Sequence, residues 1–213
     1  MSEYHKIETV FKRDPETKHR TLLAGEFSRD EFEYLRYNTW VFTEKVDGTN
    51  IRVAYDDGRL TFGGRTDNAT IPATLVARLS NMFDTHGQIA RIREIAETGV
   101  VLYGEGYGAR IQKGGGNYRQ DQGFVLFDVR VGDVWLRRDS VEDIGRKLDV
   151  DVVPVVGEGN LDEMVALAEV GFNSHWGDFL AEGIVARPAV EMHDRMGRRI
   201  ITKIKYKDFV GEK

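Results

Sequence analysis

Residues 43–50 read Thr43-Glu44-Lys45-Val46-Asp47-Gly48-Thr49-Asn50, and this segment lies where a strand is expected to end. It follows Trp40-Val41-Phe42, an apolar run typical of a strand, and its Asp-Gly pair is typical of a tight turn. We therefore expect Lys45 at the end of a strand, as a fixed and partly desolvated amine. Its pKa must fall from about 10.4, through burial or nearby cations, before the amine becomes a useful nucleophile. A hairpin turn with an exposed lysine is the alternative.

Composition excludes several classes of protein. The chain has 213 residues, 30 Lys and Arg against 35 Asp and Glu, 41% hydrophobic residues and no cysteine. Disulfides, thiolate nucleophiles and cysteine-type zinc sites are therefore ruled out, and five scattered histidines lack metal-ligand spacing. No apolar run approaches the roughly 18 residues of a membrane span, so we expect a cytoplasmic protein with no membrane partner.

The order of the expected elements predicts an α+β fold with antiparallel sheets flanked by helices. No linker or repeat divides the chain, which predicts a single domain over residues 1–213. Strands are expected at 40–42, 51–55, 60–62, 100–103, 124–131, 134–136, 183–187 and 199–204. Helices are expected at 29–37, 141–148 and 161–170, capped by Ser28, Ser140 and Asn160, with two more within 73–97.

Five further short motifs follow the Lys45 segment in order. They are Gly64-Arg65, the run from Leu102 to Gly108, the run from Gly123 to Asp128, the run from Glu182 to Pro188, and Lys203-Ile204-Lys205. This ordered set resembles the covalent nucleotidyltransferase superfamily of DNA ligases, RNA ligases and mRNA capping enzymes, and within it the RNA ligase 2 family most closely. The resemblance spans about residues 40–209 and implies a nucleotidyltransferase (adenylylation) domain.

The resemblance implies a lysyl-AMP mechanism. Lys45 would attack the α-phosphorus of ATP, and the AMP would then pass to a 5′-phosphate end that a 3′-hydroxyl attacks. Such phosphoryl transfer depends on positioning and positive charge. Lys203 and Lys205 are two apart on an expected strand, so both can face the phosphates. A basic strand edge that discourages aggregation is the alternative for this pair.

The resemblance also implies a nucleotide and metal site. Glu105 would contact the ribose hydroxyls, and Glu182 would help to bind Mg²⁺ or Mn²⁺ through water. Glu44 would accept from the adenine amino group and Phe124 would stack on adenine, although a core position is the alternative for Phe124. We expect Phe127 to be the core residue, because residues three apart on a strand face opposite sides. The residues expected around the phosphates are Asp47, Asn50 and Arg65.

A basic, glycine-rich stretch spans residues 109–119. Its cations and its aromatic side chain could follow a nucleic-acid backbone and stack on a base, whereas a mobile loop is the alternative. The residues expected to bind nucleic acid are Arg110, Lys113, Tyr118 and Arg119.

We therefore expect an ATP-dependent RNA ligase that acts on RNA or DNA ends or nicks. The alternatives are a minimal ATP-dependent DNA ligase and a non-catalytic nucleotide or nucleic-acid binding module. Asp47 stands where the RNA ligase 2 family often has His, which weakens the choice between RNA and DNA. Eight residues follow Lys205, so no C-terminal oligonucleotide-binding or helical clamp domain is expected, and a partner subunit or dimer would supply the clamp.

Overall fold

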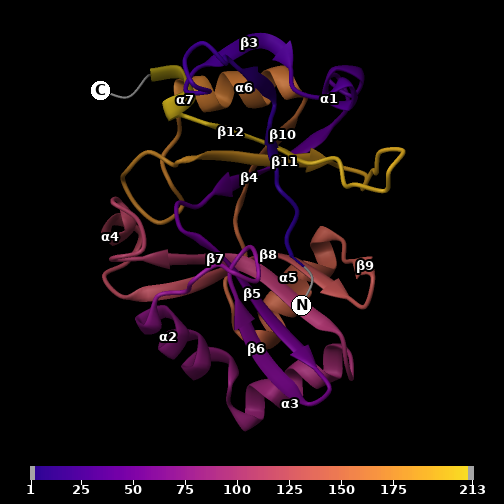
Figure 1. Ribbon diagram of the computed structural model, residues 1–213, viewed down its shortest axis with the longest axis vertical. Coiled ribbons are helices and arrows are strands. Elements are labelled where there is room, and N and C mark those ends of the chain that lie inside the picture. The colour runs from indigo at the N-terminus through magenta and orange to yellow at the C-terminus, as the bar shows by residue number, and fades with distance from the viewer. Residues whose placement is uncertain (1–2, 211–213) are drawn as a thin grey trace. The chain divides into compact units, whose positions relative to one another are not determined.

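The computed structural model describes residues 3–210 and forms two compact units, each with its own sheet and hydrophobic core (Figure 1). The first unit contains residues 3–5 and 47–153, and the second contains residues 6–46 and 154–210. The chain passes from one unit to the other after His5, Val46 and Val153. No linker marks these points in the sequence, so composition alone gave no sign of the division.

The first unit is built on a five-stranded antiparallel sheet with strand order β6-β5-β7-β8-β9. Asp57 and Gly58 both have positive φ in the turn between β5 and β6, as a tight hairpin turn requires. The strands are β5 (Thr49–Asp56), β6 (Arg59–Gly63), β7 (Val100–Gly108), β8 (Gln122–Val131) and β9 (Val134–Trp135). The helices are α2 (Ala73–Phe83), α3 (His86–Ile95), α4 (Gly115–Tyr118) and α5 (Arg138–Leu148).

One face of this sheet forms the core of the first unit. Ile51 and Val53 on β5 lie in one buried cluster with Leu79 of α2, Ile92 of α3 and Ile144 of α5. Since side chains alternate along a strand, the three helices cover the same face of the sheet. Burial of this apolar surface is the main source of stability for the unit.

The second unit contains a five-stranded sheet with strand order β1-β12-β11-β4-β10, in which β1 and β12 are parallel and the other pairs antiparallel. A second sheet pairs β2 with β3. The strands are β1 (Glu8–Thr9), β2 (Phe11–Arg13), β3 (Leu22–Phe27), β4 (Trp40–Lys45), β10 (Val155–Gly159), β11 (Gly183–Pro188) and β12 (Thr202–Lys205). The helices are α1 (Asp30–Tyr34), α6 (Leu161–Val170) and α7 (Lys207–Val210).

Side-chain alternation gives the large sheet of the second unit an apolar face and a polar face. Phe42, Ile184 and Ile204 pack with Leu161 and Met164 of α6 in the core. Side chains alternate along each strand, so Lys45 on β4 and Lys203 and Lys205 on β12 lie on the opposite face. Local sequence thus places the basic side chains on the face that α6 leaves open.

The mixed α+β architecture with antiparallel sheets is confirmed, and most elements lie where they were expected. Asn160 forms the predicted capping box with Glu163 at the start of α6. The other two predicted caps are wrong: α5 begins at Arg138, before Ser140, and the Ser28 hydroxyl donates to the Thr9 carbonyl instead of capping α1.

The described helices are all too short or too polar to cross a lipid bilayer.

Candidate active site

Three adjacent strands of the second unit bring Lys45 and Lys205 into one row. Gly183 on β11 is paired with Lys45 on β4 and with Lys205 on β12. The strand β4 ends at Lys45, as the sequence predicted. A row of this kind places the two lysine side chains on the same face with only a glycine between them.

Glu182 binds both lysines. Its Oε2 atom accepts from Lys45 Nζ at 2.5 Å, and its Oε1 atom lies 2.5 Å from Lys205 Nζ. Burial by itself would raise the pKa of Glu182, but the charges of Lys45 and Lys205 hold that pKa below its usual value. Glu182 is therefore an ionised carboxylate between two ammonium groups.

Lys203 adds a third cation to the same face. It lies on β12 two residues before Lys205, and burial lowers its pKa to about 8, with Lys45 and Lys205 contributing further repulsion. The cluster of Lys45, Lys203, Lys205 and Glu182 has a net charge of +2 when all four groups are ionised. Such a cluster attracts phosphate oxygens and loses a lysine proton more easily than an isolated lysine would.

Gly183 is required by the closeness of the strands. A Cβ atom on this residue would overlap the carbonyl oxygen of Ile204 and would lie 2.7 Å from the Cα atom of Lys205. The glycine that follows Glu182 thus allows β11 and β12 to approach each other, and this approach sets the separation of Glu182 and Lys205.

The Glu44 carboxylate, expected to accept from adenine, accepts hydrogen bonds from Ser174 and His175 in this structure. Its side chain lies on the opposite side of β4 from Lys45 and is 1% exposed. The two carboxylate oxygens accept from the Ser174 hydroxyl at 2.6 Å and the His175 amide at 2.8 Å. Burial raises the pKa of Glu44 in spite of these hydrogen bonds. In this structure Glu44 therefore holds the loop that leads to Glu182, and no local pattern of residues predicts this role.

The turn after Lys45 is held within the first unit. The Asp47 amide donates to the Tyr118 hydroxyl at 3.2 Å, and Gln112 Nε2 donates to the Gly48 carbonyl at 3.0 Å. Tyr118 is 8% exposed. Its stacking on a nucleic-acid base stays a prediction, and in this structure the glycine-rich stretch holds the backbone that follows the lysine.

Asn50 and Glu105 are directly opposite each other on β5 and β7 of the first unit. Opposite residues of an antiparallel pair point to the same side of the sheet. The Oδ1 atom of Asn50 is buried and has no hydrogen-bond partner among the described residues. A buried acceptor without a donor is costly, so this pair of oxygen-bearing side chains is suited to accept from ligand hydroxyl groups.

The two phenylalanines of β8 differ in burial, and Phe124 occupies the core position that was its alternative. Phe124 is 2% exposed and lies in the core of the first unit, where its ring meets that of Phe83 edge-on at 5.4 Å. Phe127 is half-buried and packs against Tyr4. Tyr103 and Gly104 on β7 are paired with Asp128 and Leu126, so the register shift leaves Phe127 as the unpaired residue of β8. Phe124 thus offers no exposed face to adenine in this structure.

The remaining predicted cations of the first unit differ in their exposure and in their partners within the protein. Arg119 forms an ion pair with Asp121 and lies over the ring of Tyr107, so the protein itself satisfies its guanidinium. Arg65, Arg110 and Lys113 are exposed.

Arg65 follows Gly64, whose carbonyl accepts from the buried Arg52 at 2.6 Å. Arg52 also pairs with Asp67, and so it holds the segment that carries Arg65.

Glu182, the predicted metal ligand, suits a divalent cation only when that cation is also bound to substrate phosphates. Residues 3–210 contain no group of three or more His, Asp and Glu side chains that could hold a metal ion. Glu182 is a single carboxylate beside three lysines, and a bare cation would be repelled there. A divalent ion that is already bound to substrate phosphates needs only one or two protein carboxylates, so Glu182 suits that case.

A family model described as RNA ligase matches residues 38–206. Among solved structures, a variant of the Naegleria gruberi RNA ligase without ligand superposes with a TM-score of 0.70 and 18% identity over 99% of this chain. Another variant of that ligase, with ATP and Mn, gives the same TM-score and identity, and one with AMP and Mn gives 0.70 at 17% identity. At such identities the likeness shows a shared fold.

The chain spans 57% of the length of each of those three structures. A comparison with curated protein sequences gave no match. The expectation of a partner subunit or dimer that supplies a clamp finds no support in these comparisons.

Proposed function

The chain belongs to the RNA ligase family, and we propose from this that it joins a 5′-phosphate end to a 3′-hydroxyl end of RNA in an ATP-dependent reaction that passes through an adenylate on Lys45. The observation that carries the proposal is the contact of Glu182 with both Lys45 and Lys205. A lysine held at a fixed position among further cations is what attack on a crowded phosphate requires.

The first step joins Lys45 to AMP. The Nζ atom attacks the α-phosphorus of ATP, an N–P bond forms, and the P–O bond to pyrophosphate breaks. The amine must first lose a proton to solvent, because an ammonium group has no lone pair. Burial, with added repulsion from Lys45 and Lys205, lowers the pKa of Lys203 to about 8, so this cluster favours the neutral amine.

Lys203 and Lys205 would act on the charge that develops during this step. The pyrophosphate leaving group carries negative charge away from the α-phosphorus, and ammonium groups nearby stabilise it. Glu182 keeps Lys205 in place through its Oε1 atom while its Oε2 atom loses the Lys45 ammonium as a partner.

Two further steps complete ligation. The 5′-phosphate of RNA attacks the adenylate phosphorus, which breaks the N–P bond and leaves AMP on the RNA end. A 3′-hydroxyl then attacks that end, a phosphodiester forms, and AMP departs. Arg65, Arg110 and Lys113 are exposed cations that suit contact with RNA phosphates.

Asn50 and Glu105 would accept hydrogen bonds from the ribose of the nucleotide. The buried Oδ1 atom of Asn50 supports this, since a ribose hydroxyl would give it the donor that it lacks among the described residues. When Mg²⁺ or Mn²⁺ is bound with the nucleotide phosphates, it would neutralise charge on them, and Glu182 is the carboxylate that would hold it.

A ligation assay tests the proposal. The protein is incubated with ATP, Mg²⁺ and a nicked duplex that carries a 5′-phosphate, with RNA or DNA on each side of the nick. We expect sealing of RNA nicks with the wild type and none with Lys45→Ala. Sealing confined to all-DNA nicks would favour the DNA ligase alternative, and failure on every substrate together with failure to retain AMP from ATP would contradict the proposal.

A further inference from the structure

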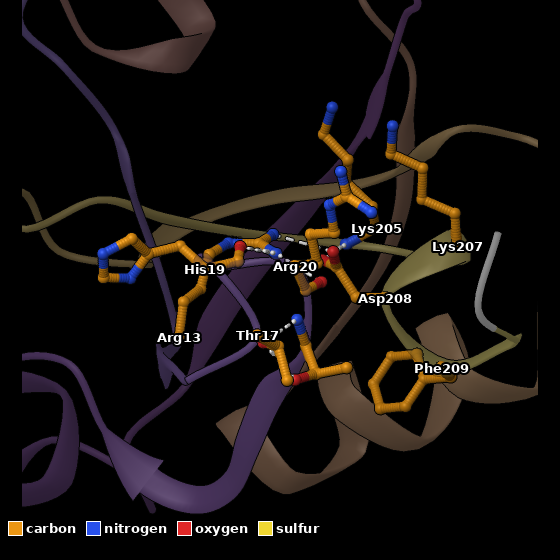
Figure 2. Close-up of a pocket in the computed structure, with 9 residues that line it drawn as sticks. Arg13, Thr17, His19, Arg20, Lys205, Lys207, Asp208 and Phe209 are labelled. Carbon is orange, nitrogen blue, oxygen red and sulfur yellow. Dashed lines mark hydrogen bonds and ion pairs between the residues drawn. The ribbon is translucent and has the colours of Figure 1, made fainter. Parts of the chain in front are cut away.

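A basic groove lies beside β12 in the second unit. The β2–β3 hairpin forms one wall and the end of β12 with α7 forms the other, and the enclosed volume is about 850 Å³ (Figure 2). The side chains on which the argument depends are Arg13, His19, Arg20, Lys205, Lys207 and Asp208.

The carboxylate of Asp208 is used within the protein. Its Oδ1 atom accepts from Arg13 Nη2 at 2.7 Å, and its Oδ2 atom accepts from the Lys205 amide at 3.0 Å. The Asp208 side chain is 3% exposed. Arg13 also donates to the Arg20 carbonyl at 3.2 Å. This negative charge therefore ties the two walls together and presents little repulsion to an anion in the groove.

Arg20 and Lys207, two other cations of the groove, are not held by a carboxylate of the described residues as Arg13 is. Arg20 and Lys207 are exposed, and within residues 3–210 no carboxylate forms an ion pair with either side chain. Figure 2 shows Lys205 and Lys207 extending their side chains to the same side. The lining thus has an excess of positive charge that the protein itself does not neutralise.

The hairpin holds its cations in a defined place. Lys18 and His19 have φ values of 55° and 61°, in the left-handed region that non-glycine residues rarely adopt. The His19 amide donates to the Asp14 carbonyl at 2.9 Å, and the hydroxyls of Thr17 and Thr21 are 2.7 Å apart. Arg20 is therefore attached to a backbone that is already ordered, which lowers the entropy that binding would cost.

We propose that this basic groove binds backbone phosphates of the RNA strand that the enzyme joins. The inference rests on the proposed function. Lys205 lines the groove and also contacts Glu182, which in turn contacts Lys45, so a strand in the groove would be adjacent to the reacting lysine cluster. The pyrophosphate portion of ATP has similar chemistry. An RNA strand is favoured because the cations come from two separate segments, residues 13–20 and 205–207, and because Arg20 and Lys207 are exposed to solvent.

The test compares two double variants that remove the same charge. Arg20→Gln with Lys207→Gln changes the groove, and Arg146→Gln with Lys147→Gln changes exposed cations on α5 of the first unit. Binding of a 5′-phosphorylated single-stranded RNA is measured by fluorescence anisotropy over a range of salt concentrations, and KM for ATP is measured by self-adenylylation.

We expect the groove variant to bind RNA at least about tenfold more weakly at low salt. Its slope of log K against log salt should fall by about 1.4, because each lost phosphate contact with a single strand removes about 0.7. The α5 variant should match the wild type, and the melting temperatures of both variants should agree with that of the wild type.

Wild-type RNA affinity and salt slope in the groove variant would overturn the proposal. A raised KM for ATP with unchanged RNA binding would assign the groove to the pyrophosphate portion of ATP and overturn it as well. Absence of self-adenylylation in the wild type would contradict the proposed function, and the RNA titration would still decide whether the groove binds phosphates.

Discussion

The Nζ atom of Lys45 lies 2.5 Å from the Oε2 atom of Glu182, although the two residues are 137 positions apart in the chain. Glu182 contacts Lys205 with its other oxygen. The carboxylate therefore keeps two like charges close together, and its removal should separate them.

We predict that Glu182→Gln lowers the rate of self-adenylylation at least about 100-fold, the scale on which one preorganised charged contact contributes to catalysis. The rate is measured with labelled ATP and divalent metal in excess. Glu158→Gln, an exposed glutamate on β10, is the control and should keep the wild-type rate. A Glu182→Gln rate within threefold of wild type would show that the contact is not needed.

The lowered pKa of Glu182 also makes stability depend on pH. A carboxyl whose pKa is lower in the folded than in the unfolded state adds stability above its unfolded pKa of about 4.5, and this is lost as pH falls through the folded value. The difference in unfolding free energy between wild type and Glu182→Gln should therefore shrink below about pH 4.5. Urea unfolding at pH 7 and pH 3.5 measures it, and a constant difference would count against the ion pairs.

Lys203 should reduce stability while it serves catalysis. Its pKa of about 8 lies below the unfolded value, so stability due to this group rises with pH from about 8 to 10.5 and is lowest below 8. We predict that Lys203→Met raises the unfolding free energy at pH 7 by on the order of 1 kcal/mol, since solvent screening reduces the full effect of the shift. It should also abolish adenylylation.

The gain for Lys203→Met should disappear near pH 10.5. Denaturation curves at pH 7 and 10.5 check this, with Lys147→Met on exposed α5 as the control for a lost surface lysine. A destabilised Lys203→Met protein at pH 7 would contradict the cost of burying the Lys203 ammonium group beside Lys45 and Lys205.

Gly183→Ala should separate β11 from β12. The added methyl group overlaps the Ile204 carbonyl, which neither strand can avoid without moving. We predict a loss of about 1–3 kcal/mol of stability, as for other overpacked sites, together with weaker adenylylation. Gly87→Ala, at an open position on α3, should be neutral or stabilising by up to about 1 kcal/mol. Stability is measured by thermal unfolding. Equal stability for Gly183→Ala and Gly87→Ala would refute the close approach of β11 and β12.

Tyr118→Phe should slow self-adenylylation about fivefold, because one hydrogen bond contributes about 1 kcal/mol to the position of the Asp47 backbone. The change should appear in kcat rather than in KM for ATP, since the hydroxyl acts on the turn after Lys45. Tyr37→Phe at an exposed site is the control. An unchanged kcat in Tyr118→Phe would remove this positioning role.

The sequence predicted the fold class and the shared face of Lys203 and Lys205 because both depend on local patterns. Alternation along a strand places Lys203 and Lys205 on one face, and the Asp47-Gly48 turn marks the end of β4. The contacts of Glu44 with Ser174 and His175 could not be predicted, because they join residues about 130 positions apart through a loop without a regular pattern.

Phe124 and Tyr118 show a second limit of the sequence. An aromatic residue on a strand or in a glycine-rich stretch is compatible with a core position and with a stacking position. The choice depends on which helix covers it, as Phe83 of α2 covers Phe124. Tertiary packing of this kind leaves no local signal.

The role of Lys45 as the adenylated residue is tested by locating the AMP in the protein. The wild-type protein is incubated with ATP and Mg²⁺ and digested, and the modified peptide is sequenced by tandem mass spectrometry, with Lys45→Arg treated in the same way. We expect one AMP on Lys45 of the wild type and none on the variant. AMP on a different residue, or efficient RNA sealing by Lys45→Arg, would contradict it.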